Sequence, residues 1–113
     1  MAWKDIVTLG TDVAETVKTA YVLLAAKETA HVWCDRTDAG STDIMVIQLW
    51  GSIDGGTTQS DTPLLELQVD PADDAKDFTV QGVYSFAISQ RNIGASGDAI
   101  TMTTKYRLDN GIA

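Results

Sequence analysis

The sequence predicts an all-β fold: a single antiparallel β-sandwich or jelly-roll-like domain with an N-terminal arm. Strand-length segments recur along the 113 residues, with clusters of Gly, Asp and Ser between them, which is typical of sandwiches and barrels. Polar and apolar residues alternate in the second half of the chain, as in a sheet with one wet face. The segment 44–53 is apolar on both faces, so we expect both faces to be covered, by a second sheet or by a neighbouring subunit.

The expected strands are bounded by turn-forming residues. Most of them are rich in β-branched or aromatic side chains, or alternate between polar and apolar residues. We interpret residues 1–10 as the arm and 11–113 as the sandwich domain, because no loop is long enough to be an interdomain linker. The expected strands cover residues 6–9, 20–26, 30–36, 44–53, 64–69, 77–81, 83–90 and 100–108.

One early segment fits a helix almost as well as strands. Asp12 and Glu15 have the spacing of a capping box, and apolar residues follow at helical spacing as far as Leu24. We favour strands, because residues 17–24 contain β-branched and aromatic side chains and residues 31–34 do not continue a helical pattern.

The strand at 44–53 runs into the dipeptide Asp54-Gly55. Both central residues of a tight hairpin turn need positive φ, and Asp-Gly is among the few pairs that adopt it at low cost. We therefore expect a tight turn directly after this strand. The pair Asp70-Pro71 also fits the start of a helical turn, with Asp70 as the N-cap and Pro71 at the first helical position.

Two later strands show alternation clearly. In the first, the aromatic and aliphatic residues at 84, 86 and 88 share one face, and the small residues at 85, 87 and 89 share the other. In the second, the apolar residues at 100, 102, 106 and 108 share a face opposite Thr, Lys and Arg. The second pattern predicts a strand that covers the core with one side and meets water with the other.

The charge excludes some partners. A net charge of −8 argues against binding nucleic acid through its phosphates, which needs a stripe of Lys and Arg. Only Lys105 and Arg107 lie close together, and we interpret them as a solvated face or one ion pair. The start of the chain has no basic leader or apolar stretch, and the run 20–26 is too short to cross a bilayer. We expect a protein made in a cytoplasm, not exported by the usual route, and without a membrane partner.

Residues suited to catalysis are sparse. His31 is the only histidine and Cys34 the only cysteine, and in one strand they would point to opposite faces, which disfavours a nucleophilic pair. We interpret both as structural, with a buried and inert thiol. A His/Cys metal cluster is excluded by count, and the acidic residues at 70–77 lack the spacing of an EF-hand. We predict no cofactor and no enzymatic activity.

Apolar and aromatic residues near the chain ends and strand ends predict contacts with a partner. Those near the two termini have no obvious cover, and others lie at the end of the strand 44–53. The predicted partner-binding residues are Trp3, Ile6, Val7, Trp50, Ile53, Leu108 and Ile112. As an alternative, Trp33 or Trp50 would stack on sugars if exposed beside polar residues such as Gln48, Asp54 and Asn92, as in a carbohydrate-binding module.

The long apolar strand ends in the sequence Leu49-Trp50-Gly51-Ser52-Ile53-Asp54-Gly55-Gly56-Thr57-Thr58. It resembles a pattern in small β-sandwich virion proteins of tailed bacteriophages, in which a strand ends in Gly-Ser-x-Asp-Gly-Gly-x-Thr. The later segment 83–93, with its aromatic residues and its Arg-Asn pair, is similar to a later strand of those proteins. Gln59 departs from the pattern, because an aromatic residue is common at its position.

The resemblance covers roughly residues 44–108 and implies a structural role in a virion. It implies a capsid decoration or cement protein, a homotrimer on the capsid surface that binds the major capsid protein between capsomers and stabilises the shell. It implies no active site. A tail or head-completion component of the same kind of virion remains an alternative, as does the carbohydrate-binding module.

Overall fold

The computed structural model describes residues 4–11, 18–19, 21–25, 28–38, 43–70, 75–93 and 100–109, with the backbone alone for 4–11 and 38. These residues form β-strands, turns and loops, and none of them is helical. The strands are β1 (Lys4–Thr11), β2 (Val22–Leu23), β3 (Thr29–Asp38), β4 (Ile44–Ser52), β5 (Leu65–Val69), β6 (Ala75–Val80), β7 (Ser85–Ile93) and β8 (Ile100–Asp109).

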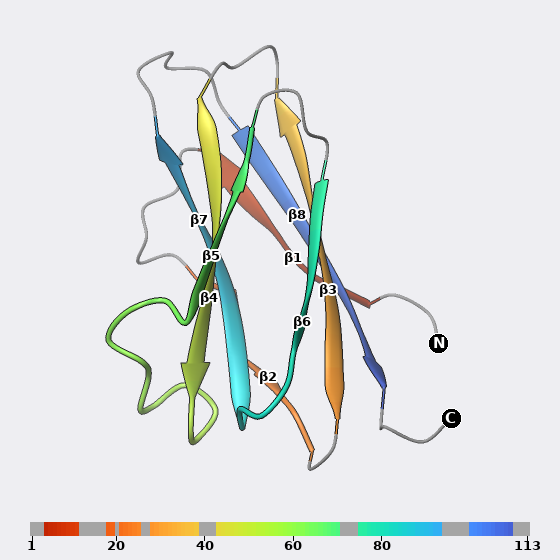
Figure 1. Cartoon of the computed structure of the whole chain (residues 1–113), viewed down its shortest axis with the longest axis vertical. Helices are drawn as coiled ribbons and strands as arrows, with labels where there is room; N and C mark the ends of the chain where they lie inside the picture. The colour runs from red at the N-terminus through yellow and green to blue at the C-terminus, as the bar shows by residue number, and fades with distance from the viewer. Residues whose placement is uncertain are drawn as a thin grey trace.

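The strands form two four-stranded sheets packed face to face (Figure 1). Sheet A has the order β1-β8-β3-β6 and sheet B the order β2-β7-β4-β5, and every pairing is antiparallel. Consecutive strands alternate between the sheets, except that β4 and β5 are neighbours in sheet B. This is the strand order of an eight-stranded jelly roll, so the predicted all-β antiparallel sandwich is confirmed.

Each predicted strand has a counterpart, although the one expected at 20–26 is reduced to Val22–Leu23. The backbone around it bonds to β7 and to the residue before it: Thr19 N donates to Ile88 O at 2.8 Å and Leu24 N to Tyr84 O at 2.8 Å. These amides bond to a distant part of the chain, whereas a helix would need bonds within the segment. The alternative of a helix is therefore wrong for the described residues of this segment. Residues 12–17 and 71–74 lie outside the described residues, and with them the capping box and most of the Asp70-Pro71 turn.

Residues 4–10, predicted as part of an arm, lie in β1 and belong to sheet A. β1 pairs antiparallel with β8, with register shifts between Asp5 and Val7 and between Leu9 and Thr11. The physical reason is that β8 has a free edge in the absence of β1, and pairing satisfies the backbone groups of both strands. The boundary at residue 10 therefore does not separate an arm from the sandwich.

The core lies between the two sheets. Sheet B contributes Met45, Ile47, Phe86 and Ile88, and sheet A contributes Val32, Cys34, Ile100 and Met102, all within one hydrophobic cluster. The rings of Phe86 and Tyr106 meet edge to face, with centroids 6.5 Å apart and an interplanar angle of 86°, a favoured aromatic geometry. The apolar alternation seen in the sequence thus identifies the core-facing side of β8.

A buried arginine links the sheets at one end of the core. The Arg36 side chain of β3 is 7 % exposed, and its guanidinium donates to the carbonyl of Val69 in β5 at 2.8 Å. Burying a guanidinium is unfavourable unless its donors are satisfied. This bond across the sandwich satisfies one of the donors and joins β3 to β5.

Candidate interaction surfaces

Strand β4 is buried along both faces, as the sequence predicts, and its outer face carries a hydrogen-bonded network. Trp50 Nε1 donates to Ser89 Oγ at 2.8 Å, and Ser89 Oγ donates to Gln48 Oε1 at 2.9 Å. Gln48 Nε2 then donates to Glu66 Oε2 at 3.1 Å, and Arg91 Nη2 lies 3.2 Å from the same oxygen. The network joins β4 to both of its neighbours in sheet B. The outer face of β4 is therefore covered by side chains of this same chain.

The loop over residues 53–64 is organised by Ser52. The Ser52 hydroxyl donates to Thr58 O at 2.6 Å and accepts the N–H of Gly56 at 2.8 Å. Asp54 Oδ1 accepts the N–H of Thr58 at 2.7 Å. The Thr58 N–H, with further hydrogen bonds from the loop, holds the pKa of the Asp54 carboxyl below its ordinary value.

The expected tight hairpin at Asp54-Gly55 is wrong, because this longer loop connects β4 to β5. In this loop two consecutive glycines, Gly55 (80°) and Gly56 (122°), have positive φ. Ser52 also forms an isolated bridge with Gln59, so the loop folds back on the end of β4 before β5 begins. The Ser52 hydroxyl accepts a hydrogen bond from the loop backbone and so stabilises a loop longer than a two-residue turn.

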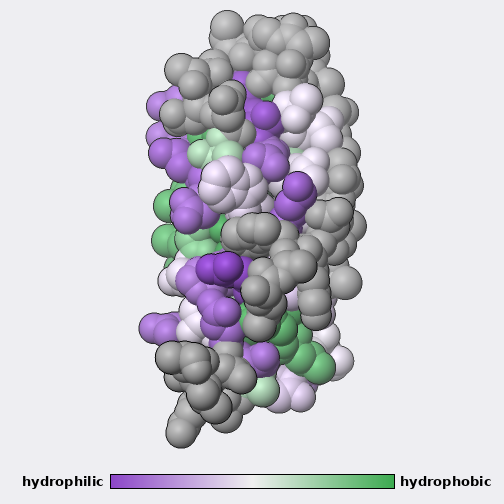
Figure 2. All heavy atoms as spheres, turned by 90° about the vertical axis from the view of Figure 1, so that its right-hand side faces the viewer, coloured by the Kyte–Doolittle hydropathy of each residue, from purple (hydrophilic) through white to green (hydrophobic). Residues whose placement is uncertain are grey.

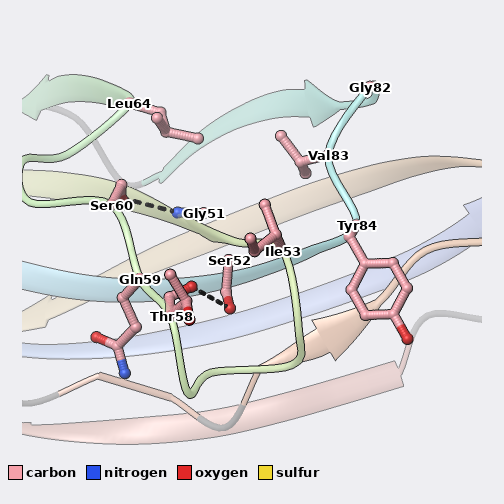
Figure 3. Close-up of a pocket in the computed structure, with 10 residues that line it drawn as sticks. All are labelled: Gly51, Ser52, Ile53, Thr58, Gln59, Ser60, Leu64, Gly82, Val83 and Tyr84. Carbon is pink, nitrogen blue, oxygen red and sulfur yellow. Dashed lines mark hydrogen bonds between the residues drawn. The ribbon is translucent and has the colours of Figure 1, made fainter.

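This loop forms one wall of a groove of about 360 Å³ at the end of the sandwich (Figure 3). The other walls come from the end of β4 and from residues 82–84 before β7. Ile53 and Leu64, from the two ends of this loop, and Val83, from the segment before β7, extend toward the groove, while the Tyr84 ring points away from it (Figure 3). Gly51 lies beneath Leu64, because a Cβ atom at position 51 would lie only 2.7 Å from Leu64 Cδ1.

Exposed apolar side chains line this groove or lie beside it. Ile53 is 75 % exposed, Leu23 55 %, Tyr84 53 % and Leu64 52 %. Leu23 reaches the loop, since a Cβ atom on Gly55 would lie 3.6 Å from Leu23 Cδ2. We call Leu23, Ile53, Leu64, Val83 and Tyr84 the end surface.

A second hollow, of about 600 Å³, lies on the other side of residues 82–84. It is lined by Leu24, Ala25, Glu28, Thr29, Gln81 and the same Gly82–Tyr84 segment. The end surface therefore has a hollow on each side of residues 82–84. Such a surface is suited to shape-complementary contact with a partner.

The predicted partner-binding residues are not gathered on one surface. Ile53 is exposed, as expected, and belongs to the end surface. Trp50, expected at an exposed strand end, is 7 % exposed, because its ring packs on the outer face of sheet B under Lys18 and its N–H is bonded to Ser89. Leu108 packs against the core, because it lies in β8 rather than in a free tail.

The remaining predicted contacts lie in or beyond β1. Ile6 and Val7 are in β1, and Val7 pairs with Thr104 of β8. Trp3 and Ile112 lie outside the described residues. Whether these four contact a partner stays a prediction.

Leu23, Leu64 and Tyr84 are exposed, although the sequence patterns did not predict them as surface residues. Leu64 lies just before β5, which begins at Leu65, and both leucines are exposed. Alternation predicts Tyr84 on the face of Phe86, but Tyr84 precedes β7, so the alternation of the strand does not extend to it.

The outer face of sheet A has a different character. Figure 2 views the side on which sheet A lies in Figure 1, and most of the described residues there are hydrophilic. Trp33 of β3 is 39 % exposed, and its Nε1 donates to Asp35 Oδ1 at 2.6 Å. Of the two tryptophans considered for sugar stacking, Trp33 is therefore exposed and Trp50 is buried.

The two residues that the sequence identified as structural lie on opposite sides of β3. Cys34 is fully buried, and burial raises the pKa of its thiol to about 12. His31 lies outward, with Nε2 2.8 Å from Asp109 Oδ2. Among the described residues, no three His, Cys, Asp or Glu side chains are grouped so that they could hold a metal ion. No helix among them is long and apolar enough to cross a membrane.

Comparison with family models, with curated proteins and with solved structures found no match to this chain.

Proposed function

We propose that this protein is a structural component of a bacteriophage virion, which decorates and stabilises the capsid by binding between capsomers. The observation that carries the proposal is the end surface: Ile53 and Leu64, each more than half exposed, line a groove at one end of a jelly roll, and two further exposed apolar side chains, Leu23 and Tyr84, lie beside it. A contiguous apolar region of this kind on a small domain marks a protein-binding site. The resemblance of residues 49–58 and 83–93 to virion proteins points to the class of partner.

The groove suits a protein partner. Its lining combines the apolar side chains of Ile53, Leu64 and Val83 with polar atoms from Ser60 and Thr58 at its edge, so an inserted apolar side chain is buried while its backbone finds hydrogen-bond partners. The surrounding segments are held in place, since Ser60 N donates to Gly51 O at 2.8 Å and Leu64 N to Leu49 O at 2.7 Å. A prearranged surface loses less entropy on binding.

The rest of the sandwich fits a building block that repeats on a lattice. Two of the four edge strands have features that disfavour uncontrolled strand pairing: β2 has only two residues, and β1 has two register shifts. At these two edges, association by strand addition is disfavoured. A trimer would present three end surfaces to a capsid, and weak single contacts become strong when they act together.

Particle composition tests the proposal. Virions are purified from the host in which this gene is naturally expressed, and copies per particle are measured by quantitative mass spectrometry against the major capsid protein. A copy number in proportion to the capsid lattice supports decoration. A number that matches a single ring supports the tail or head-completion alternative, and absence from the particle overturns both.

Two matched variants test the surface. Ile53→Asp places a charge in the end surface and is expected to abolish binding to undecorated capsids. Ile93→Asp is the control, because Ile93 is also exposed, at 41 %, but lies at the other end of β7 from Tyr84. Equal binding by both variants contradicts the assignment of the contact to the end surface. Native mass of the wild-type protein separately tests the trimer.

A further inference from the structure

We infer that the outer face of sheet A holds a second binding site, centred on Trp33, that takes a neutral polysaccharide. Seven large hydrophobic side chains are exposed in the described part of the chain. Six of them lie in sheet B or in the loops that adjoin it, and Trp33 alone lies in sheet A. This ring is therefore separate from the end surface.

The register of the sheet places polar residues on every side of the ring. Asp77 of β6 and Lys105 of β8 are the direct cross-strand partners of Trp33, and cross-strand partners project from the same face of a sheet. His31 and Asp35 lie two positions away along β3 and share that face. The site is thus an aromatic platform at the centre of donors and acceptors.

The ring is also oriented. Its N–H is bonded to Asp35 at 2.6 Å, which fixes the tilt of the indole. An exposed aromatic ring on an open sheet presents a flat apolar surface, which fits the C–H face of a pyranose ring. Sugar hydroxyls both donate and accept hydrogen bonds, and the carboxylates of Asp35 and Asp77 and the ammonium of Lys105 complement both functions.

The surroundings favour a glycan over a protein. A stable protein contact buries about 800 Å² on each partner around an apolar centre, whereas Trp33 is the only large apolar side chain exposed on the described part of this face. A sugar polymer needs a stacking ring and hydrogen bonds rather than a broad apolar area. The net charge of −8 repels acidic polysaccharides at long range, so the expected ligand is uncharged.

Pyranoses with equatorial hydroxyls are the best match, because only their C–H faces are flat and uninterrupted. We expect β-linked glucose or N-acetylglucosamine oligomers to bind with a dissociation constant on the order of 1 mM, as one ring and a few exposed hydrogen bonds allow. Repetition on a particle would multiply this weak contact. That last step alone rests on the proposed capsid role; the site itself does not.

The test is an NMR titration of the isolated ¹⁵N-labelled protein with cellohexaose and with the N-acetylglucosamine hexamer. The chain has three tryptophans, so its indole N–H signals report which ring is contacted. The expected result is a saturable shift of the Trp33 indole and of the amides of β3, β6 and β8. Oligogalacturonate, which is acidic, is expected to bind more weakly than either neutral probe.

Variants make the assignment specific. Trp33→Ala is expected to weaken binding at least about 10-fold, and Lys105→Ala and Asp77→Ala, which leave the ring in place, to weaken it by roughly 3-fold each. Tyr84→Ala on the end surface is the control and should bind as the wild type does. The spectra also report whether each variant is folded.

The inference is overturned if neither neutral probe shifts any signal at about 10 mM. Shifts confined to the end surface, or unchanged affinity in Trp33→Ala, overturn it as well. If Trp33→Ala instead dissociates an oligomer of this chain, the face is a protein interface. Because no capsid is used, a negative result leaves the decoration proposal standing.

Discussion

The ammonium group of Lys18 lies 3.9 Å from the centre of the Trp50 ring. It also donates to Gln59 Oε1 at 2.7 Å. Trp50 is nearly buried, so little water competes for the ring, and a cation over an aromatic face is worth more there than at an open surface. Lys18 thus connects the segment before β2 with β4 and with the loop that borders the groove.

Lys18→Met is expected to destabilise the protein by about 1 kcal/mol, through loss of the cation–π contact and of the bond to Gln59. Methionine keeps most of the length of the side chain and removes the charge. Urea denaturation measures the change. Lys105→Met, on the outer face of sheet A, is the control and should cost less than about 0.5 kcal/mol; equal effects would show that the position over Trp50 has no special value.

Ser89 is the central member of the network on sheet B, because it accepts from Trp50 and donates to Gln48. Ser89→Ala leaves the indole N–H and the Gln48 carbonyl buried without this partner. The expected loss is about 1–3 kcal/mol, the usual cost of unsatisfied buried polar groups. The measurement is again the free energy of unfolding.

A double-mutant cycle separates this effect from lost packing. Gln48→Met removes the acceptor that Ser89 serves and keeps the volume. If the network acts as described, Ser89→Ala costs less in the Gln48→Met background than in the wild type. Strictly additive effects would mean that the two side chains are energetically independent despite the 2.9 Å bond.

Cys34 is expected to be inert in the folded protein. Burial raises the pKa of its thiol to about 12 from an ordinary value near 9, and the thiolate is the reactive form. A thiol reagent such as Ellman's reagent at about pH 8 should label the native chain only as fast as it unfolds, and should label it at once in urea. Rapid labelling of the native protein would contradict the burial.

The same pKa shift predicts a pH dependence. Below about pH 9 the thiol is neutral in both states, so its contribution to stability is fully present; between about pH 9 and 12 only the unfolded chain ionises, and stability falls. Cys34→Ala removes this dependence, although it costs stability at neutral pH by leaving a small cavity. The difference between wild type and Cys34→Ala should therefore shrink as the pH rises from 9 to 12.

Strand positions follow from the sequence because alternation is a local property. In β8 the residues at 100, 102 and 104 are buried, whereas those at 101 and 103 are partly exposed, and no knowledge of the partner strand is needed to see it. The strand order within the sheets is not local, since β7 lies between β2 and β4. The sequence therefore predicts a sandwich without specifying its strand order.

Whether a residue on an outer face is covered by other side chains is not predicted by the sequence. Trp33 and Trp50 both alternate with core residues, yet Trp33 is exposed and Trp50 is buried. The difference comes from distant contacts: Ser89 is 39 positions from Trp50, and Lys18 reaches Trp50 from before β2. A residue's face can be read from its neighbours in the chain, but what covers that face cannot.

The groove on the end surface depends on the absence of a side chain at position 51. A Cβ atom there would lie 2.7 Å from Leu64 Cδ1, closer than two carbon atoms approach, so Gly51→Ala must displace the end of the Leu64 side chain. We expect a loss of about 1 kcal/mol from this crowding, together with weaker binding of any partner that occupies the groove. Urea denaturation and binding to undecorated capsids measure the two effects.

Leu64→Ala is the matching variant, because it removes the atom that the new methyl group would meet. In this background Gly51→Ala should be neutral or slightly stabilising, since alanine restricts the unfolded chain more than glycine does. Gly82→Ala serves as the control: its φ of 77° makes alanine strained, but nothing lies within 4 Å of the new Cβ, so its cost should not depend on Leu64. If Gly51→Ala costs the same with and without the leucine side chain, steric contact with Leu64 is not the reason for glycine at this position.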